Sequence, residues 1–200
     1  MYCILKIVEI DTSLKIKVFE GVYEPAEDSY LLIKAIEAGA RKKALDMGCG
    51  CGIIALHLAK NGCVVTAADI NDGAVENTRQ NAEMNRLEIK CIKSDLFSNI
   101  DDKFDLIAFN PPYLPTSGED RAWDGGKEGM EVIRRFLKEA GNYLTKGGVI
   151  YIILSSLNDV KKLCRGFPQY EFKKIAEEKF FFERIYAYKL LMKESPLSSF

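Results

Sequence analysis

The sequence shows little charge imbalance and no long apolar run. Among its 200 residues, 28 Lys and Arg side chains stand against 29 Asp and Glu side chains, which leaves a net charge of -1. Proteins that hold nucleic acid mainly through its phosphates usually carry a basic face, so this balance disfavours nucleic acid as a partner. No run approaches the roughly 18 apolar residues of a membrane helix, and the first residues lack a signal-peptide core. We therefore expect a cytoplasmic protein that does not associate with membranes.

Metal ligands are also scarce. The six cysteines are scattered without a C-x-x-C pair, and His57 is the single histidine. A structural zinc site needs about four such ligands at tight spacings. The sequence therefore predicts no metal site, and it predicts cysteines that remain reduced thiols.

What the sequence does contain is a regular alternation of strand and helix patterns, in a chain long enough for one domain. This alternation predicts a mostly parallel sheet of seven strands with helices on both faces. Strands are expected at 44–47, 64–68, 89–92, 104–109, 149–154, 170–176 and 181–191, and helices at 25–38, 53–60, 71–85, 130–144 and 159–165. The last two strands should pair antiparallel. The run Phe180 to Phe182 is interpreted as strand core, although on an exposed edge it could dock a partner.

The first residues predict a separate small element. Residues 2–10 and 14–20 alternate and are rich in β-branched side chains, which indicates a β-hairpin. We therefore divide the chain into a hairpin extension, residues 1–21, and a main domain, residues 22–200. A long stretch without predicted structure, residues 114–129, is the kind of loop that usually has a function.

A glycine-rich turn follows the first strand of the main sheet. Gly48, Gly50 and Gly52 come directly after Asp46, and such glycines allow a ligand to approach the backbone beside a helix N-terminus. A dinucleotide-binding turn would carry glycine where this chain has Ile53, and the Asp46 carboxylate would repel a pyrophosphate. Asp46 instead suits a positively charged ligand, such as the ammonium or sulfonium group of S-adenosylmethionine.

Asp69 and Asp95 end the next two predicted strands. An acid in the position of Asp69 can accept hydrogen bonds from both ribose hydroxyls of a nucleoside. Asp95, or the backbone next to it, could meet an adenine amino group. Together with Asp46, these acids mark the carboxyl edge of the sheet, where such folds bind their ligands. Solvated strand ends are the alternative interpretation of Asp69 and Asp95.

The turn Asn110-Pro111-Pro112-Tyr113 follows the strand at 104–109. Each proline fixes φ, removes an N–H donor and keeps the preceding residue extended, so the turn is stiff and offers carbonyl acceptors without competing donors. The Asn110 side-chain carbonyl and the Pro111 main-chain carbonyl can hold the two hydrogens of one planar NH2 group. Tyr113 gives that group a flat face to lie against. A rigid turn without chemistry is the alternative.

A planar NH2 group is a poor nucleophile because its lone pair is delocalised. Two carbonyl bonds to its hydrogens would aim the nitrogen at a methyl donor and stabilise the positive charge that develops during attack. No base is needed before transfer, because the charged product nitrogen is acidic. The same chemistry serves a protein amide and adenine N6, and the charge balance favours the protein amide.

These motifs together resemble the class I S-adenosylmethionine-dependent methyltransferases, and the resemblance implies their Rossmann-like α/β fold. The narrower match is to the HemK-like protein-(glutamine-N5) methyltransferases, in the eukaryotic and archaeal branch that modifies release factors. The residues that carry it are the glycine turn, Asp69, Asn110 to Tyr113, the motif YEPAEDS at 23–29 and the motif AWDGGKEG at 122–129. The resemblance covers about residues 22–154, most of the chain.

The resemblance implies an enzyme that methylates the side-chain amide of the glutamine in the Gly-Gly-Gln loop of a translation release factor. The residues that would hold that amide are Asn110, Pro111, Pro112 and Tyr113. The residues that would contact S-adenosylmethionine are Ser29, Asp46, Gly48, Gly50, Asp69, Asp95, Leu96 and Asn110. Close relatives often carry Glu at the position of Asp46. The side chain of Asp46 is shorter than that of Glu, but it should still reach the ammonium group of the cofactor.

The resemblance also implies a partner, because relatives in this branch commonly work with a small zinc-binding activator subunit. Trp123, the single tryptophan, is a candidate substrate-binding residue as a lid or wall of the site, or else an anchor for the long loop. Two alternatives remain open for the function. One is N6-adenine methylation of DNA or RNA, and the other is S-adenosylmethionine binding without catalysis, which would not need the Asn-Pro-Pro-Tyr turn.

Overall fold

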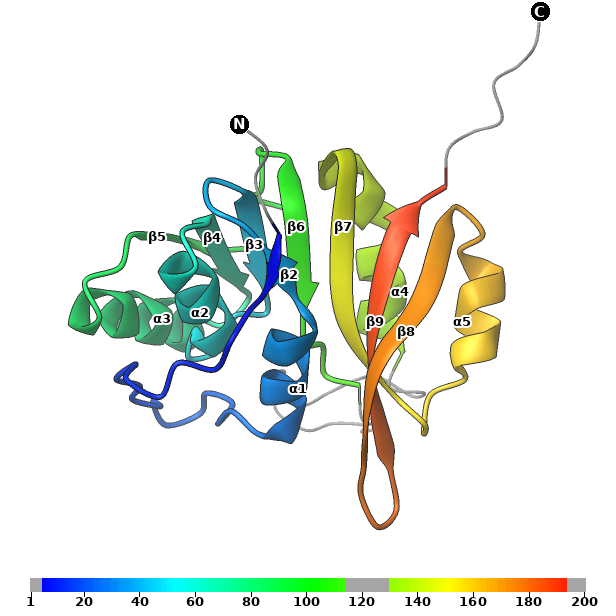
Figure 1. Cartoon of the computed structure of the whole chain (residues 1–200), viewed down its shortest axis with the longest axis horizontal. Coiled ribbons are helices and arrows are strands. Elements are labelled where there is room, and N and C mark those ends of the chain that lie inside the picture. Colours follow the sequence, from blue (N-terminus) through cyan, green and yellow to red (C-terminus); the bar gives the residue numbers. More distant parts are fainter. Residues whose placement is uncertain (1–4, 114–129, 194–200) are drawn as a thin grey trace, which may run out of the picture.

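One mixed β-sheet of seven strands organises the protein. The structure, a computed structural model, describes residues 5–113 and 130–193. The strand order is β5-β4-β3-β6-β7-β9-β8, in which β5 through β7 run parallel and β9 and β8 are antiparallel (Figure 1). The strands are β3 (Lys43–Met47), β4 (Val64–Asp69), β5 (Ile89–Lys93), β6 (Phe104–Phe109), β7 (Leu144–Ser155), β8 (Tyr170–Lys179) and β9 (Arg184–Met192). The predicted fold class is confirmed.

Helices cover both faces of this sheet. They are α1 (Glu27–Ala35), α2 (Ile53–Lys60), α3 (Asp72–Met84), α4 (Glu131–Glu139) and α5 (Val160–Gly166). Because side chains alternate along a strand, Ala44 packs into the core under α1 and α2, while its neighbour Leu45 packs into the core under α4 and α5. Within the described residues, no helix is both long enough and apolar enough to span a bilayer.

The helix predicted at 130–144 is shorter than expected, whereas α2 and β6 have the predicted bounds. The α-helical part ends at Glu139, a 3-10 turn follows at Ala140–Tyr143, and β7 already begins at Leu144. Leu144 pairs with Phe104 of β6, and a register shift follows in this pairing. The contact with the neighbouring strand therefore ends the helix early, although the apolar periodicity of the sequence continues.

An N-terminal two-stranded sheet is present, but the predicted pairing within it is wrong. β1 (Lys6–Ile7) pairs antiparallel with β2 (Glu37–Ala38), which follows α1, and not with residues 14–20. Residues 14–20 form no strand.

Asparagines of α3 hold the backbone that was expected to form the second hairpin strand. Asn81 accepts from the Lys17 N–H at 2.9 Å and donates to the Lys17 carbonyl at 2.8 Å. Asn85 does the same for Lys15, and Asn77 accepts from the Phe19 N–H. Four helical residues rise about 6 Å and two extended residues span about 6.7 Å, so the two spacings match. The strand-like alternation therefore reflects pairing with a helix.

The prediction that Phe180 to Phe182 are strand core is also wrong. These residues form the turn between β8 and β9, where Phe181 is 92% exposed and Phe182 is 87% exposed. The strands pair up to Lys179 and Arg184, which leaves the phenylalanines at the tip.

Candidate active site

A cavity of about 1180 Å³ opens at the carboxyl ends of β3, β4 and β6, a size suited to a nucleoside ligand. Ten of the predicted site residues line it: Ser29, Gly48, Gly50, Asp69, Asp95, Leu96, Asn110, Pro111, Pro112 and Tyr113. Asp46 is not part of the wall. Trp123 and the motif at 122–129 lie outside the described residues. The fold thus brings the glycine turn and the Asn-Pro-Pro-Tyr turn to one place.

The glycine turn bends in a way that other residues rarely adopt. Gly48, Gly50 and Gly52 have φ angles of 64°, 54° and 84°. A Cβ atom on Gly52 would lie 2.8 Å from the Thr78 Cγ2 atom, so glycine is also needed for space. The turn therefore stays close to α3 and keeps its backbone accessible from the cavity.

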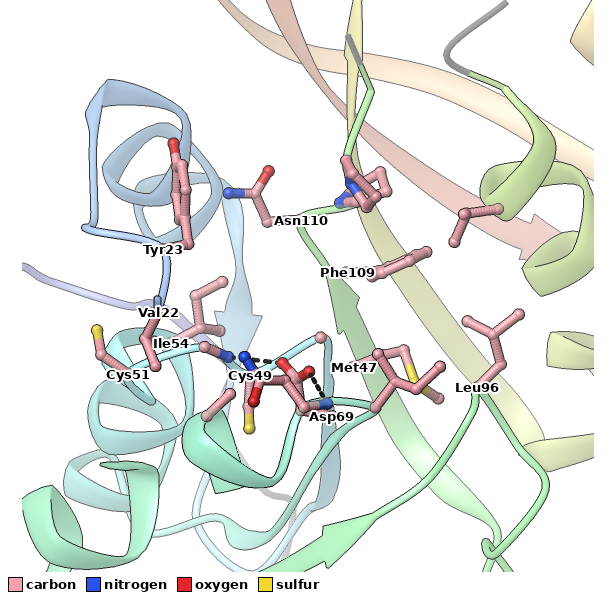
Figure 2. A pocket seen from close by; sticks show the side chains of 18 of the residues that line it. Val22, Tyr23, Met47, Cys49, Cys51, Ile54, Asp69, Leu96, Phe109 and Asn110 are labelled. Carbon is pink, nitrogen blue, oxygen red and sulfur yellow. Dashed lines mark hydrogen bonds between the residues drawn. The ribbon is translucent and has the colours of Figure 1, made fainter. Parts of the chain in front are cut away.

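Asp69 at the end of β4 joins this turn to the cavity (Figure 2). Its Oδ2 accepts from the Gly50 N–H at 3.0 Å, and its Oδ1 accepts from the Asn71 N–H at 2.9 Å. Burial raises the pKa of the Asp69 carboxyl, although these backbone donors oppose the shift. Because each carboxylate oxygen can accept two hydrogen bonds, Asp69 keeps acceptor capacity for ligand hydroxyls.

Asp46 lies behind the glycine turn and is almost completely buried, with 1% exposure. Its Oδ2 accepts from the Ala55 N–H of α2 at 2.9 Å, and its Oδ1 has no partner among the described residues. Burial raises the pKa of Asp46 from 3.8 to about 8, with a further contribution from the Asp69 charge. At neutral pH this carboxyl therefore keeps its proton and is uncharged.

Asn110 lines the cavity with its side-chain amide (Figure 2). Its Nδ2 donates to the Ser29 hydroxyl at 3.3 Å, which orients the amide. Its Oδ1 is buried and has no partner among the described residues. A buried carbonyl without a donor is unfavourable, so this oxygen suits a ligand N–H group.

Asp28 connects two lining residues of the cavity, Tyr23 and Tyr113. It was not singled out from the sequence. It accepts from the Tyr23 hydroxyl at 2.9 and 2.8 Å, from the Tyr113 hydroxyl at 3.2 Å and from the Ser29 N–H at 2.6 Å. Burial and the charge of Asp28 raise the pKa values of Tyr23 and Tyr113, so both hydroxyls stay protonated and donate. The signal was its position within the YEPAEDS motif, beside Ser29.

Two further contacts complete the walls. Asn158, which follows β7, donates from Nδ2 to the Tyr113 carbonyl at 2.8 Å and so supports the acceptor turn. Asp95 accepts from Arg135 of α4 at 2.8 Å, a pairing that the sequence did not indicate. Leu96 next to it has a φ of 50°, a left-handed conformation unusual for a leucine.

Comparison with known proteins places these features in a family. The methyltransferase small domain model matches residues 20–181. A Methanocaldococcus jannaschii protein, provisionally named a protein N5-glutamine methyltransferase, is 43% identical over 175 residues, which cover 84% of this chain and 88% of that protein. The human methyltransferase HEMK2 is 32% identical over 74% of this chain and 78% of its own length. The Schizosaccharomyces pombe catalytic subunit of the eRF1 methyltransferase, mtq2, is 30% identical, with 78% and 81% covered.

Solved structures show the same likeness. The E. cuniculi Mtq2-Trm112 complex, which is responsible for the methylation of the translation termination factor eRF1, matches with a TM-score of 0.71 and 28% identity, over 86% of this chain and 99% of the matched chain. A methyltransferase from Pyrococcus furiosus matches with a TM-score of 0.71 and 25% identity, over 90% and 89%. The resemblance deduced from the motifs is confirmed, and the chain belongs to the methyltransferase small domain family.

Proposed function

We propose that this protein transfers a methyl group from S-adenosylmethionine to the side-chain amide nitrogen of a glutamine in a translation release factor. The observation that carries the proposal is the unpaired, buried Oδ1 of Asn110 next to the two prolines. This geometry suits an NH2 donor, and the proline turn adds a second carbonyl acceptor at Pro111. Relatives named for this reaction cover most of the chain.

The residues of the cavity fit S-adenosylmethionine. Asp69 has acceptor capacity for ribose hydroxyls, whereas Asp46 does not line the cavity and makes no direct contact with it. Asp95 and Leu96 line the part of the cavity assigned to adenine. When bound, the cofactor supplies a methyl group on a positively charged sulfur.

The acceptor turn prepares the amide nitrogen for attack. Asn110 Oδ1 and the Pro111 carbonyl accept its two hydrogens, which orients the nitrogen and stabilises the positive charge that forms on it. Tyr113, whose hydroxyl is fixed by Asp28, provides the face for the planar amide. After transfer the charged nitrogen loses a proton to water, so no residue has to act as a base beforehand.

The protein partners follow from the relatives. Mtq2 was solved together with Trm112, and we propose that a small activator subunit, zinc-binding in our expectation, also accompanies this chain. A release factor substrate would place the enzyme in the cytoplasm, where translation ends. We also propose that the chain divides into an N-terminal extension, residues 1–21, and a main domain, residues 22–200.

Methylation of a nucleic-acid base is the second candidate, because an adenine presents the same NH2 group. Ribosomal RNA methyltransferases are among the relatives, one of them 30% identical over 79% of this chain but only 46% of its own length. The net charge of -1 disfavours a nucleic-acid substrate.

A direct assay separates the two candidates. The full chain, alone and with a small activator subunit, is incubated with S-adenosylmethionine and either a release factor or RNA and DNA. Mass spectrometry then locates the mass gain of one CH2 group. We expect it on the glutamine of the Gly-Gly-Gln loop. Methylated nucleic acid with an unmodified release factor would overturn the proposal.

A further inference from the structure

We propose that the tip of the β8–β9 hairpin docks the protein substrate beside the cavity that receives its glutamine. The tip is defined here as Phe180, Phe181 and Phe182. The inference rests on the proposed function, because it takes a folded protein as the methyl acceptor. It adds a second contact surface outside the cavity.

The tip exposes apolar surface that the fold does not use. Phe181 and Phe182 have the largest exposed fractions of all large apolar side chains in the described residues. Their rings meet edge to face with centroids 4.6 Å apart, and the Phe180 N–H donates to the Glu183 carbonyl at 2.7 Å, which closes the turn. Exposed aromatic pairs on an ordered turn are typical anchors of protein interfaces, because burying them removes much apolar area from water.

The tip lies at the edge of the sheet where the cavity opens. Figure 1 shows the hairpin extending past the arrowhead of β6, on the side where α1 lies. Asn110 follows β6 directly, so the acceptor turn belongs to the same edge. A glutamine that enters the cavity brings its flanking protein across this edge.

Hydrogen bonds connect the hairpin to the acceptor turn. The Ser156 N–H donates to the Arg184 carbonyl at 2.8 Å, and the Arg184 N–H donates to the Ser156 hydroxyl at 2.9 Å. Asn158, two residues further along, donates to the Tyr113 carbonyl. The segment after β7 therefore holds the first residue of β9, next to the tip, and the acceptor turn in a fixed relation.

The link between the tip and the acceptor turn indicates which molecule binds the tip. A protein that inserts a glutamine must cover the rim of the cavity in every catalytic cycle, whereas an activator or a second copy of the chain has no such need. Because the tip is connected through Asn158 to Tyr113, a substrate bound to the tip is also aligned with the acceptor turn. The methyl-accepting protein is thus the partner that fits the tip.

The test uses the full chain with its activator subunit and compares three proteins. They are the unchanged enzyme, the double variant Phe181→Ser, Phe182→Ser, and the control Val64→Ser. Val64 is 61% exposed and begins β4, at the opposite edge of the sheet from the cavity. Steady-state kinetics are measured with an intact release factor and with a short peptide that carries its Gly-Gly-Gln loop.

We expect the double variant to raise KM for the intact factor about tenfold, the size of effect seen when interface anchors are truncated, with kcat unchanged. Its kinetics on the peptide, its affinity for S-adenosylmethionine and its binding of the activator should equal those of the control. An unchanged KM for the intact factor overturns the inference and leaves the proposed function standing. An equal loss on factor and peptide, weaker activator binding or an altered oligomeric state also overturns it. If the unchanged enzyme methylates neither substrate, the proposed function itself fails.

Discussion

Two buried aspartates, one in the cavity wall and one outside it, have very different surroundings. Asp28, on the acceptor side, is 4% exposed and accepts from two tyrosine hydroxyls and a backbone N–H. Asp46, outside the cavity wall, is 1% exposed and accepts from one backbone N–H, and one of its oxygens has no partner among the described residues.

The difference indicates two tasks. A carboxylate that is surrounded by donors fixes the groups that donate to it, so Asp28 positions the acceptor wall. A carboxyl that is buried with few donors keeps its proton, so Asp46 is uncharged at neutral pH and does not gather donors in this way. Asp28 therefore organises the acceptor side before the ligand binds, while Asp46 links the stability of the protein to pH.

The largest effect is expected at the acceptor side, for Asn110→Ala. Loss of its Oδ1 acceptor removes a hydrogen bond that strengthens as charge develops on the nitrogen, so kcat should fall about 100-fold or more. Cofactor affinity, measured by calorimetry, should stay nearly normal. Asn61→Ala serves as the control, because Asn61 directly follows α2 and is not part of the cavity wall. Retained turnover in Asn110→Ala would defeat the acceptor model.

A change at the cofactor side should show the opposite kinetic signature. Asp69→Ala removes a charged acceptor, and hydrogen bonds to charged groups contribute about 1.5–3 kcal/mol, so cofactor affinity should weaken about 10- to 100-fold. Turnover at saturating cofactor should change less. Calorimetric affinity equal to that of the unchanged protein would remove Asp69 from the site.

The positioning role of Asp28 predicts a smaller effect. Asp28→Asn keeps the shape and one acceptor oxygen but replaces a charged acceptor by a neutral one for the Tyr113 hydroxyl. The weaker bond, by about 1 kcal/mol, should lower kcat about fivefold and change KM for the cofactor little. Tyr23→Phe, which leaves the Tyr113 contact in place, is the matched comparison and should lose less. If both variants turned over at the full rate, Asp28 would not position the wall.

Asp46 predicts a pH dependence of stability in the ligand-free protein. Its pKa is raised from 3.8 to about 8 by burial, so between these values the folded protein holds a proton that the unfolded protein has lost. The free energy of unfolding therefore falls as the pH rises through this range.

Asp46→Asn removes this titration. Its stability advantage over the unchanged protein should grow from about pH 5 to about pH 8 by about 1 kcal/mol or more, since one pKa unit corresponds to about 1.4 kcal/mol. Chemical denaturation at several pH values measures the difference. A constant difference across the range would show that Asp46 does not titrate there.

Local sequence patterns determined much of the fold and of the site. The bounds of α2 and β6 follow from apolar periodicity, and the cap of α3 follows from the chemistry of Asn71, which accepts from the Gly73 N–H at 2.8 Å. The glycine turn and the Asn-Pro-Pro-Tyr turn were recognisable because their backbone requirements allow few other residues. Parallel strands then bring both turns to one edge.

Tertiary structure decided what depends on residues distant in sequence. The pairing of Leu144 with β6 shortened α4, and the asparagines of α3 replaced a strand as partner of residues 15–19. These outcomes, like the hydrogen bond from Tyr113 to Asp28, arise between residues far apart in sequence, which a local pattern of apolar and polar residues does not encode.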